Sequence, residues 1–424
     1  MSRPQQQAIS GPCFVPGPLL LPGPGQGIEG WASPAAEAAD WNLEAWQELE
    51  SSSGPSLRAM QLPQALLHRV DTQSRWQAAQ TAMEQQLPGM RALETGFVYL
   101  ERTLPDGQCR PGLVGLVDLE QYSFEPGSSC PVRQPQPLSA QQVLPRAQLR
   151  ETALMETSPV RLLANLPSED LFEPIQAVCK KQPCLYEGRL GSGGGTVRAW
   201  QVNQPQLLDQ LARLFAPQSD GVPLMIAVEG QCALAGAKVD WMLRKEERAQ
   251  PDHPARFCLA EVGCADHPAA GIAPLHRLVM GVQGLPLLAQ LEQWCVRQGI
   301  ALTQSPQPGA ARLTLVYGRW ERTLWLKAKA PVPGVCLAEA FLQEYLSTNP
   351  MCSTDRLAQE SQLRELAADG VSGILLECTG PDLFMGLAAE GILPAGSFAP
   401  FAMAESRFEL ECRLIAGESR DKDL

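Results

Sequence analysis

Apolar and polar positions divide the first third of the chain into helix-like and strand-like segments. Helical spacing of apolar residues occurs at 41–49 and again at about 63–88. Two strand-like runs flank "PDG" at 105–107 and predict a β-hairpin. This part of the chain is therefore predicted to combine α-helix and β-sheet.

Strand-like and helix-like segments continue to alternate beyond residue 145. Apolar runs predict strands at 159–166, 196–202, 222–228 and 255–263. The Pro- and Gln-rich stretch at 127–146 predicts a loop before them. A helix over 286–298 is followed by further strand-like runs and the helical run "LAEAFLQEYL". The predicted fold class is α+β, with mixed sheets and flanking helices.

The chain has 424 residues, enough for two or three domains. The patterns predict an extended N-terminal segment at 1–30 and an N-terminal α+β domain at 31–144. A central α/β domain at 145–285 and a C-terminal α+β region at 286–424 follow.

Composition is that of an ordinary globular protein, with 45% hydrophobic and 19% charged residues. The net charge of -12 argues against a nucleic-acid partner. Apolar runs are shorter than the roughly 20 residues that a membrane span requires, and the N-terminus lacks a signal-peptide pattern. The 13 cysteines form no CxxC pair, which favours reduced, mostly buried thiols. We expect a cytoplasmic protein that binds neither membranes nor nucleic acids.

The stretch "VEGQCALAGAKVDW" at 228–241 lies where an apolar strand is predicted to end and a helix of small residues to begin. Backbone N–H groups at such a junction favour anions. Glu229, Gly230, Gln231 and Cys232 occupy it, which makes the junction a candidate binding site.

Three other motifs carry candidate binding chemistry. The glycine run at 191–195 offers backbone amides but lacks the Lys-Ser/Thr of a Walker loop, so a plain turn is favoured. Arg146 and Arg150 lie one helical turn apart and are either an anion clamp or paired, solvated charges. His276 and Arg277 are either an anion-binding acid/base pair or a hydrogen-bonded structural element.

Four residues within a short stretch have the chemistry of zinc ligands. They are His253, Cys258, Cys264 and His267, but their spacing matches no familiar finger. The strand-like run between them places Cys258 toward a core. Buried thiols and loop histidines are therefore favoured, and no metal is predicted.

Five segments, taken in order, resemble one family. They are "RAQLRETA", "GGTVRAW", "EGQCALAGAK", "HPARFCLAEV" and "PLHRLV". Their order and spacing resemble the bacterial domain of unknown function 1015 family, nearly from end to end. The family's box is similar to the nucleotide- and phosphate-handling box of ParB and sulfiredoxin-like proteins. The resemblance implies a ParB/sulfiredoxin-like element in the central region, a phosphorylated small molecule or nucleotide as ligand, and no cofactor.

Relative to that family, this chain has lost polar groups at five motifs. In the box the acid is Glu229, and Gln231 and Cys232 hold the Asn and His positions. The resemblance places further altered positions at Glu37, Ala38, Gln136, Thr196, Ala358, Ala395 and Gly396. The retained residues are Arg146, Arg150, Gly194, Gly195, Gly230, Lys238, Arg256, His276 and Arg277.

Loss across all five motifs favours a pseudoenzyme, a catalytically degenerate homologue that binds a ligand or partner. The alternative is an active enzyme of small-molecule phosphate or amino-acid metabolism, performing phosphotransfer or phosphate hydrolysis. Its catalytic candidates are Glu229, Cys232 and His276. An interaction protein without a small ligand also stays open, and the pattern does not set the oligomeric state.

Overall fold

The structure is a computed structural model in which most of the chain is described. It describes residues 11–34, 55–63, 66–191, 194–218, 222–247, 250–270, 272–330, 332–357, 359–378, 380–391, 393–394, 397–399 and 408–415. The helix predicted at 41–49 lies outside these residues.

The chain divides into two compact units. Unit 1 comprises Met1–Ala270, Met385–Gly391 and Met403–Leu424, and unit 2 comprises Gly271–Phe384 and Ile392–Ala402. Each unit has a large hydrophobic core of its own. Within the described residues, no helix is long and apolar enough to cross a membrane.

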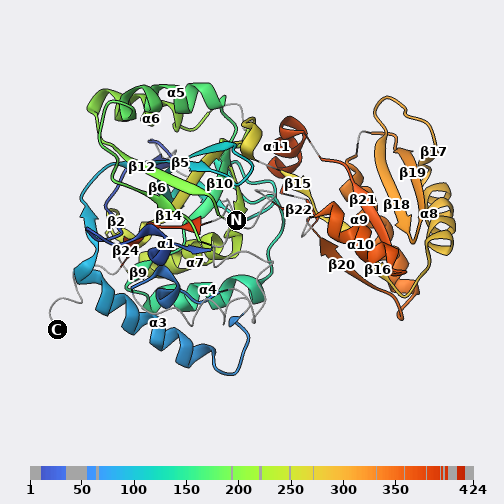
Figure 1. Ribbon diagram of the computed structural model, residues 1–424, viewed down its shortest axis with the longest axis horizontal. Coiled ribbons are helices and arrows are strands. Elements are labelled where there is room, and N and C mark those ends of the chain that lie inside the picture. The colour runs from blue at the N-terminus through green and yellow to red at the C-terminus, as the bar shows by residue number, and fades with distance from the viewer. Residues whose placement is uncertain are drawn as a thin grey trace, which may run out of the picture. The chain divides into compact units, whose positions relative to one another are not determined.

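Unit 1 is built on a ten-stranded mixed sheet (Figure 1). Its strand order is β11 (Tyr186–Arg189), β12 (Thr196–Val202), β5 (Phe97–Thr103), β6 (Cys109–Asp118), β14 (Phe257–Cys264), β10 (Val160–Ala164), β13 (Met225–Glu229), β8 (Val132–Arg133) and β7 (Tyr122–Ser123), with β1 (Phe14–Val15) paired to β6. The predicted hairpin around "PDG" is the antiparallel β5–β6 pair. The predicted boundary at 144 falls between strands that share this sheet.

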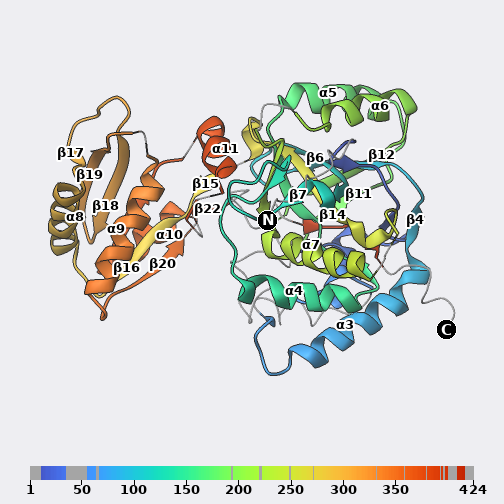
Figure 2. The same ribbon diagram turned by 180° about the vertical axis from the view of Figure 1, so that it is seen from behind.

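Helices cover unit 1 on two sides (Figures 1 and 2). On one side lie α5 (Ser168–Cys179) and α6 (Pro205–Leu214), whose apolar stripes pack on the sheet. On the other lie α7 (Gln231–Glu246), α4 (Ala140–Thr152) and α3 (Thr72–Gln86). An amphipathic helix packs on a sheet through such an apolar stripe.

The stretch at 127–146 was predicted as a loop, but its second half is helical. Helix α4 begins at Ala140, where the side chain of Gln142 accepts a hydrogen bond from the Ser139 N–H at 2.9 Å. This capping interaction satisfies an exposed N–H group at the helix start. Pro145 lies within the helix, so a Pro-rich composition was a poor guide here.

Several short pairings complete unit 1. Residues 408–415 contribute β23 (Phe408–Glu409), paired with β3 (Ser33–Pro34), and β24 (Arg413–Leu414), paired with β9 (Met155–Glu156). A further pair joins β2 (Leu19–Leu21) to β4 (Arg91–Leu93). The short helices α1 (Ile28–Trp31) and η1 (Leu57–Met60) lie in the same N-terminal part. The end of the chain is thus paired with its beginning.

Unit 2 holds a six-stranded antiparallel sheet. Its order is β17 (Ala301–Thr303), β19 (Trp320–Lys327), β18 (Ala311–Tyr317), β21 (Ser372–Leu376), β16 (His276–Met280) and β20 (Ser353–Leu357). Helices α8 (Gly284–Gln298) and α9 (Gly334–Thr348) pack on it through one apolar core. Helix α10 (Glu360–Ala368) packs through a second, smaller one, and α11 (Pro381–Ala389) follows. Both units combine sheets with flanking helices, which confirms the predicted α+β class.

Candidate functional site

The candidate site begins where β13 ends and α7 starts. Gly230 joins the two elements with φ +73°, a left-handed conformation that favours glycine. A Cβ atom at Gly230 would lie 2.8 Å from Cγ1 of Val160. Both the turn and the close approach require glycine, so Gly230 has a structural role at the predicted strand–helix junction.

The small residues of α7 allow a close crossing with α4. A Cβ atom at Gly236 would lie 2.8 Å from the backbone nitrogen of Ala147. Leu234, Ala235 and Ala237 are buried beside it. The alanine- and glycine-rich sequence of the box is therefore explained by helix packing.

Glu229, the acid of the box, belongs to a buried ionic network on the sheet. Its Oε2 lies 3.1 Å from Nε of Arg161, and the two side chains are 7% and 1% exposed. Arg161 also binds Glu261 at 2.5 Å, and Glu261 in turn binds Arg102. We call Arg102, Arg161, Glu229 and Glu261 the strand network.

Electrostatics favour the charged form of Glu261 in the strand network. Burial alone would raise the pKa of Glu261, but the guanidinium groups of Arg102, Arg161 and Arg110 outweigh it and lower the pKa to about 2. An ionised carboxylate in such surroundings is stable only because cations face it. The network is thus a set of fixed ion pairs.

Two glutamines contact the first turn of α7. Nε2 of Gln136 donates to Oε1 of Gln231 at 2.9 Å, and Nε2 of Gln134 donates to the Gln231 carbonyl at 3.1 Å. Cys232 is half-buried beside them. The structure therefore brings Gln136 into contact with the box.

Other altered positions do not join this cluster. Thr196 starts β12, and β5, β6, β14 and β10 lie between that strand and β13. Glu37, Ala38, Ala358, Ala395 and Gly396 lie outside the described residues.

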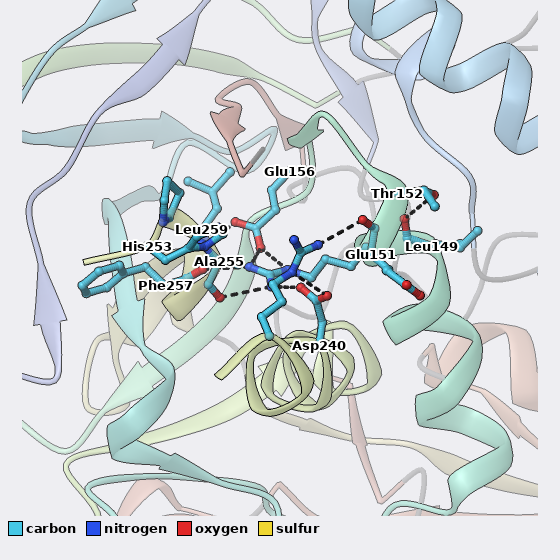
Figure 3. A network of polar contacts seen from close by, with 12 residues as sticks. Leu149, Glu151, Thr152, Glu156, Asp240, His253, Ala255, Phe257 and Leu259 are labelled. Carbon is cyan, nitrogen blue, oxygen red and sulfur yellow. Dashed lines mark hydrogen bonds and ion pairs between the residues drawn. The ribbon is translucent and has the colours of Figure 1, made fainter. Parts of the chain in front are cut away.

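Arg150, one of the two clamp candidates, is held by protein acceptors. It pairs with Glu156 at 2.9 Å and with Asp240 at 2.7 Å, and it donates to the carbonyls of Ala255 and Phe257. Figure 3 shows Glu156 and Asp240 reaching the same polar network from different elements. The other clamp candidate, Arg146, is buried and donates to the Leu62 carbonyl at 3.1 Å.

Two further cationic side chains of the predicted site also contact other groups of the chain. Nζ of Lys238 donates to the Leu119 carbonyl at 2.6 Å, and burial lowers its pKa. Arg256 pairs with Asp118 at 2.6 Å, and this hydrogen bond raises its pKa. Lys238 therefore contacts η4 (Leu119–Gln121), and Arg256 contacts Asp118, the N-cap residue of η4.

Gly194 and Gly195 form part of the turn between β11 and β12. Gly195 has φ +79°, and the N–H of Leu190 donates to its carbonyl at 2.9 Å. A Cβ atom at Gly195 would lie 2.0 Å from the Thr103 carbonyl oxygen. The glycine requirement here is that of a tight turn.

His276 and Arg277 lie in unit 2, on β16. Nδ1 of His276 accepts from the Leu376 N–H at 3.1 Å, and burial lowers its pKa. Arg277 pairs with Glu339 at 2.9 Å. Both contacts are structural, and the catalytic candidates Glu229 and His276 belong to different units.

The four residues of zinc-ligand type serve separate local contacts. Nδ1 of His253 accepts from the Ala255 N–H, and Nδ1 of His267 accepts from the Ala269 N–H. Cys258 and Cys264 are buried on β14. Among the described residues, no group of three or more His, Cys, Asp or Glu side chains could hold a metal ion.

Comparison with known protein families matches residues 30–347 to the model "Protein of unknown function (DUF1015)". The chain belongs to the DUF1015 family. No curated protein matches the chain.

Solved structures resemble this DUF1015 chain only distantly. SbnI with a C-terminal truncation, from Staphylococcus aureus, is 11% identical with a TM-score of 0.35, covering 70% of this chain and 82% of its own. A free serine kinase in complex with AMP is 9% identical with a TM-score of 0.35, covering 67% and 85%. A conserved hypothetical protein from Pyrococcus furiosus is 7% identical with a TM-score of 0.33, covering 67% and 88%.

Sequence reasoning missed the partners of Glu229. Arg161 and Glu261 each interrupt an otherwise apolar strand, in "VRLLA" and "FCLAEVGC". Charges inside buried strands must be paired. Opposite charges in two apolar strands were therefore a usable signal for this network.

Proposed function

We propose that this DUF1015 chain is a non-catalytic family member that binds a ligand or partner. The observation that carries this proposal is the buried ion pair of Glu229 with Arg161 at 3.1 Å. A general acid or base must reach the proton that it transfers. A carboxylate fixed against a buried guanidinium is poorly placed to do so.

The other candidate residues support the same proposal. Arg150, Arg256 and Arg277 are each paired with a carboxylate of the chain. At the start of α7, the amides of Gln136 and Gln231 bind each other. Side chains that satisfy one another hold a scaffold in place and leave less capacity for reaction chemistry.

The ligand class is part of the proposal. We infer a phosphorylated small molecule or nucleotide at the first turn of α7, where helix N–H groups favour anions. The same inference assigns a ParB/sulfiredoxin-like element to the region of the box. Both rest on the residues of the box.

The test measures turnover and binding separately. Purified protein is incubated with ATP, ADP and phosphoserine, and phosphate release or transfer is followed by ³¹P NMR. We expect no product above the protein-free control. Product that disappears in both Cys232→Ala and Glu229→Gln would overturn the proposal and favour the active-enzyme alternative.

Binding is measured by thermal shift with the same compounds. A ligand at 100 times its Kd stabilises the folded state by about 2.7 kcal/mol. We expect a rise in Tm of roughly 4 °C for at least one of them. An unchanged Tm with every compound would contradict the proposed ligand class and favour a protein partner.

A further inference from the structure

Residues 408–415 of unit 1 form a short segment that we call the C-terminal strap. Seven of its eight residues are buried. Its backbone pairs with β3 and with β9 over two residues each. The attachment of such a short segment depends on its side chains as well as on these pairings.

Three side chains of the strap are ionisable and almost fully buried. They are Glu409, Glu411 and Arg413, each at most 1% exposed. Buried charges are stable only when they are paired or hydrogen-bonded. Oε2 of Glu409 accepts from Nε2 of Gln61 at 2.5 Å and from Oγ of Ser158 at 2.9 Å. Nη1 of Arg413 pairs with Glu156 at 3.0 Å. Both of these side chains therefore have firm polar partners.

The third side chain, Glu411, is less well supported. Its Oε1 accepts a hydrogen bond from the hydroxyl of Tyr186. Its Oε2 is buried and has no hydrogen-bond partner within the described part of the chain. A buried carboxylate requires several donors or a cation of its own, whereas a neutral carboxyl group is much less costly to bury. The geometry around Glu411 therefore suits the protonated form.

The charges around Glu411 also oppose its ionisation. Its charged and titratable neighbours are Tyr186 of β11, Arg102 of β5, Arg161 of β10 and Glu261 of β14, with Glu409 and Arg413 on the strap itself. Arg102 and Arg161 both pair with Glu261, so these two cations already face an ionised carboxylate. Burial and the charge of Glu261 raise the pKa of Glu411, against the opposing effects of Arg102 and Tyr186.

We propose that Glu411 is a pH-sensitive latch of the C-terminal strap, which docks firmly while this carboxyl group is protonated and loosens when it releases its proton to solvent. The docked strap also contacts the strand network. The Phe408 carbonyl accepts from Nη2 of Arg102 at 3.1 Å and from Nη2 of Arg161 at 3.4 Å. Loosening of the strap therefore removes an acceptor that these two arginines share.

The direction of the pH effect follows from the raised pKa of Glu411. In the docked strap this pKa lies above the ordinary value of 4.5. The contribution of Glu411 to docking is therefore fully present below pH 4.5 and is lost as the pH rises through the raised pKa. Glu261 has the opposite sign, since its contribution is lost only below pH 4.5. The two carboxyl groups consequently act in separate pH ranges.

Hydrogen exchange of the full-length folded protein, followed by mass spectrometry, measures the opening of the strap. Peptides that cover 408–415 report on the strap, and peptides from β10 and β14 report on the sheet of unit 1. Peptides from β18 report on unit 2. Wild type and Glu411→Gln are compared at each pH between about 5 and 8. Both proteins share the intrinsic pH dependence of amide exchange, so their ratio reports on the carboxyl group.

The ratio of strap opening in wild type to that in Glu411→Gln should increase with pH. We expect a rise of about tenfold per pH unit until the pH passes the pKa of docked Glu411, and a constant ratio above it. Glutamine keeps the size of the side chain but cannot ionise. Glu187→Gln, at an exposed position of β11, is the matched control and should behave as wild type does at every pH.

A second variant separates ionisation from packing. Tyr186→Phe removes the hydrogen bond to Glu411, and such a bond is stronger to an ionised carboxylate than to a neutral carboxyl group. We therefore expect Tyr186→Phe to increase strap opening by a larger factor at the upper end of the pH range than at the lower end. When Glu411→Gln is also present, the factor should be the same at both ends.

Three outcomes would overturn the proposal. The first is a constant ratio of wild type to Glu411→Gln over the whole pH range. The second is an equal rise in the peptides from β10 and β14, which would show that unit 1 opens as a whole. The third is a pH-independent effect of Tyr186→Phe, which decides the matter alone if the exchange of β10 and β18 shows Glu411→Gln to be unfolded. No ligand enters these measurements, so this proposal and the proposed function fail separately.

Discussion

The sheets of the two units carry charge in different ways. In unit 1, the ion pair of Arg161 with Glu261 lies within the sheet, and both side chains are at most 6% exposed. In unit 2, Arg312 pairs with Glu377 at 3.6 Å, and these side chains are 50% and 54% exposed. The first pair is therefore buried within its sheet, and the second lies in water.

This difference in burial determines how much each ion pair contributes to stability. A buried pair gains little net stability, but removing one partner is strongly destabilising because the other stays buried. An exposed pair contributes about 0–1 kcal/mol. The pair of Arg161 with Glu261 should consequently tolerate only complete replacement, while the pair of Arg312 with Glu377 should tolerate single changes.

The largest effect is expected from Arg161→Leu. It removes the guanidinium that faces both Glu229 and Glu261. We expect the free energy of unfolding of unit 1 to fall by about 3–5 kcal/mol. Urea unfolding, followed by hydrogen exchange of peptides from β10 and β14, assigns the loss to this unit.

A double variant sharpens this result. Arg161→Leu combined with Glu229→Leu replaces an ion pair by apolar side chains and should recover part of the lost stability. A double variant less stable than Arg161→Leu alone would show that Glu229 is held chiefly by other contacts.

Acid should weaken unit 1 through the strand network. The pKa of Glu261 is about 2 in the folded protein against an ordinary value of 4.5. Because the folded pKa is depressed, its contribution is present above pH 4.5 and is lost as the pH falls toward 2. The loss is on the order of 3 kcal/mol.

The measurement is urea unfolding at several pH values between about 5 and 2, the window that the shifted pKa sets. Arg161→Leu should show a shallower decline, since the pKa of Glu261 is then less depressed. Parallel declines in the two proteins would argue against this electrostatic account.

The smallest effect is expected in unit 2. Arg312→Leu removes an exposed pair with Glu377. We expect a change below about 1 kcal/mol in the free energy of unfolding of this unit. A loss as large as that of Arg161→Leu would break the comparison between the two sheets.

Sequence patterns located the candidate junction but not its chemistry. The strand end at Glu229 and the helix start at Gln231 were readable because apolar runs and small residues mark them. The partner Arg161 could not be predicted from the sequence. Strands β10 and β13 are far apart along the chain, and their pairing has a register shift between Arg161 and Leu162. Residues far apart in sequence supply the charge that decides what Glu229 can do.

Local signals explain the other successes and failures. The "PDG" hairpin follows from turn residues between two strands. The Pro-rich stretch misled because its composition does not reveal the capping contacts between Ser139 and Gln142 at the start of α4.

The pairing of the end of the chain with its beginning bears on how the protein is made. Leu20 and Cys412 exchange backbone hydrogen bonds, and the Trp31 indole donates to the Leu410 carbonyl. During synthesis the C-terminal partners emerge after nearly all of unit 2. Unit 2 can complete its sheet while two smaller cores of unit 1 still lack Phe408, Leu410, Cys412 and Ile415. A nascent chain therefore leaves these two cores incomplete after unit 2 has been made, and exposed apolar surface of this kind favours aggregation.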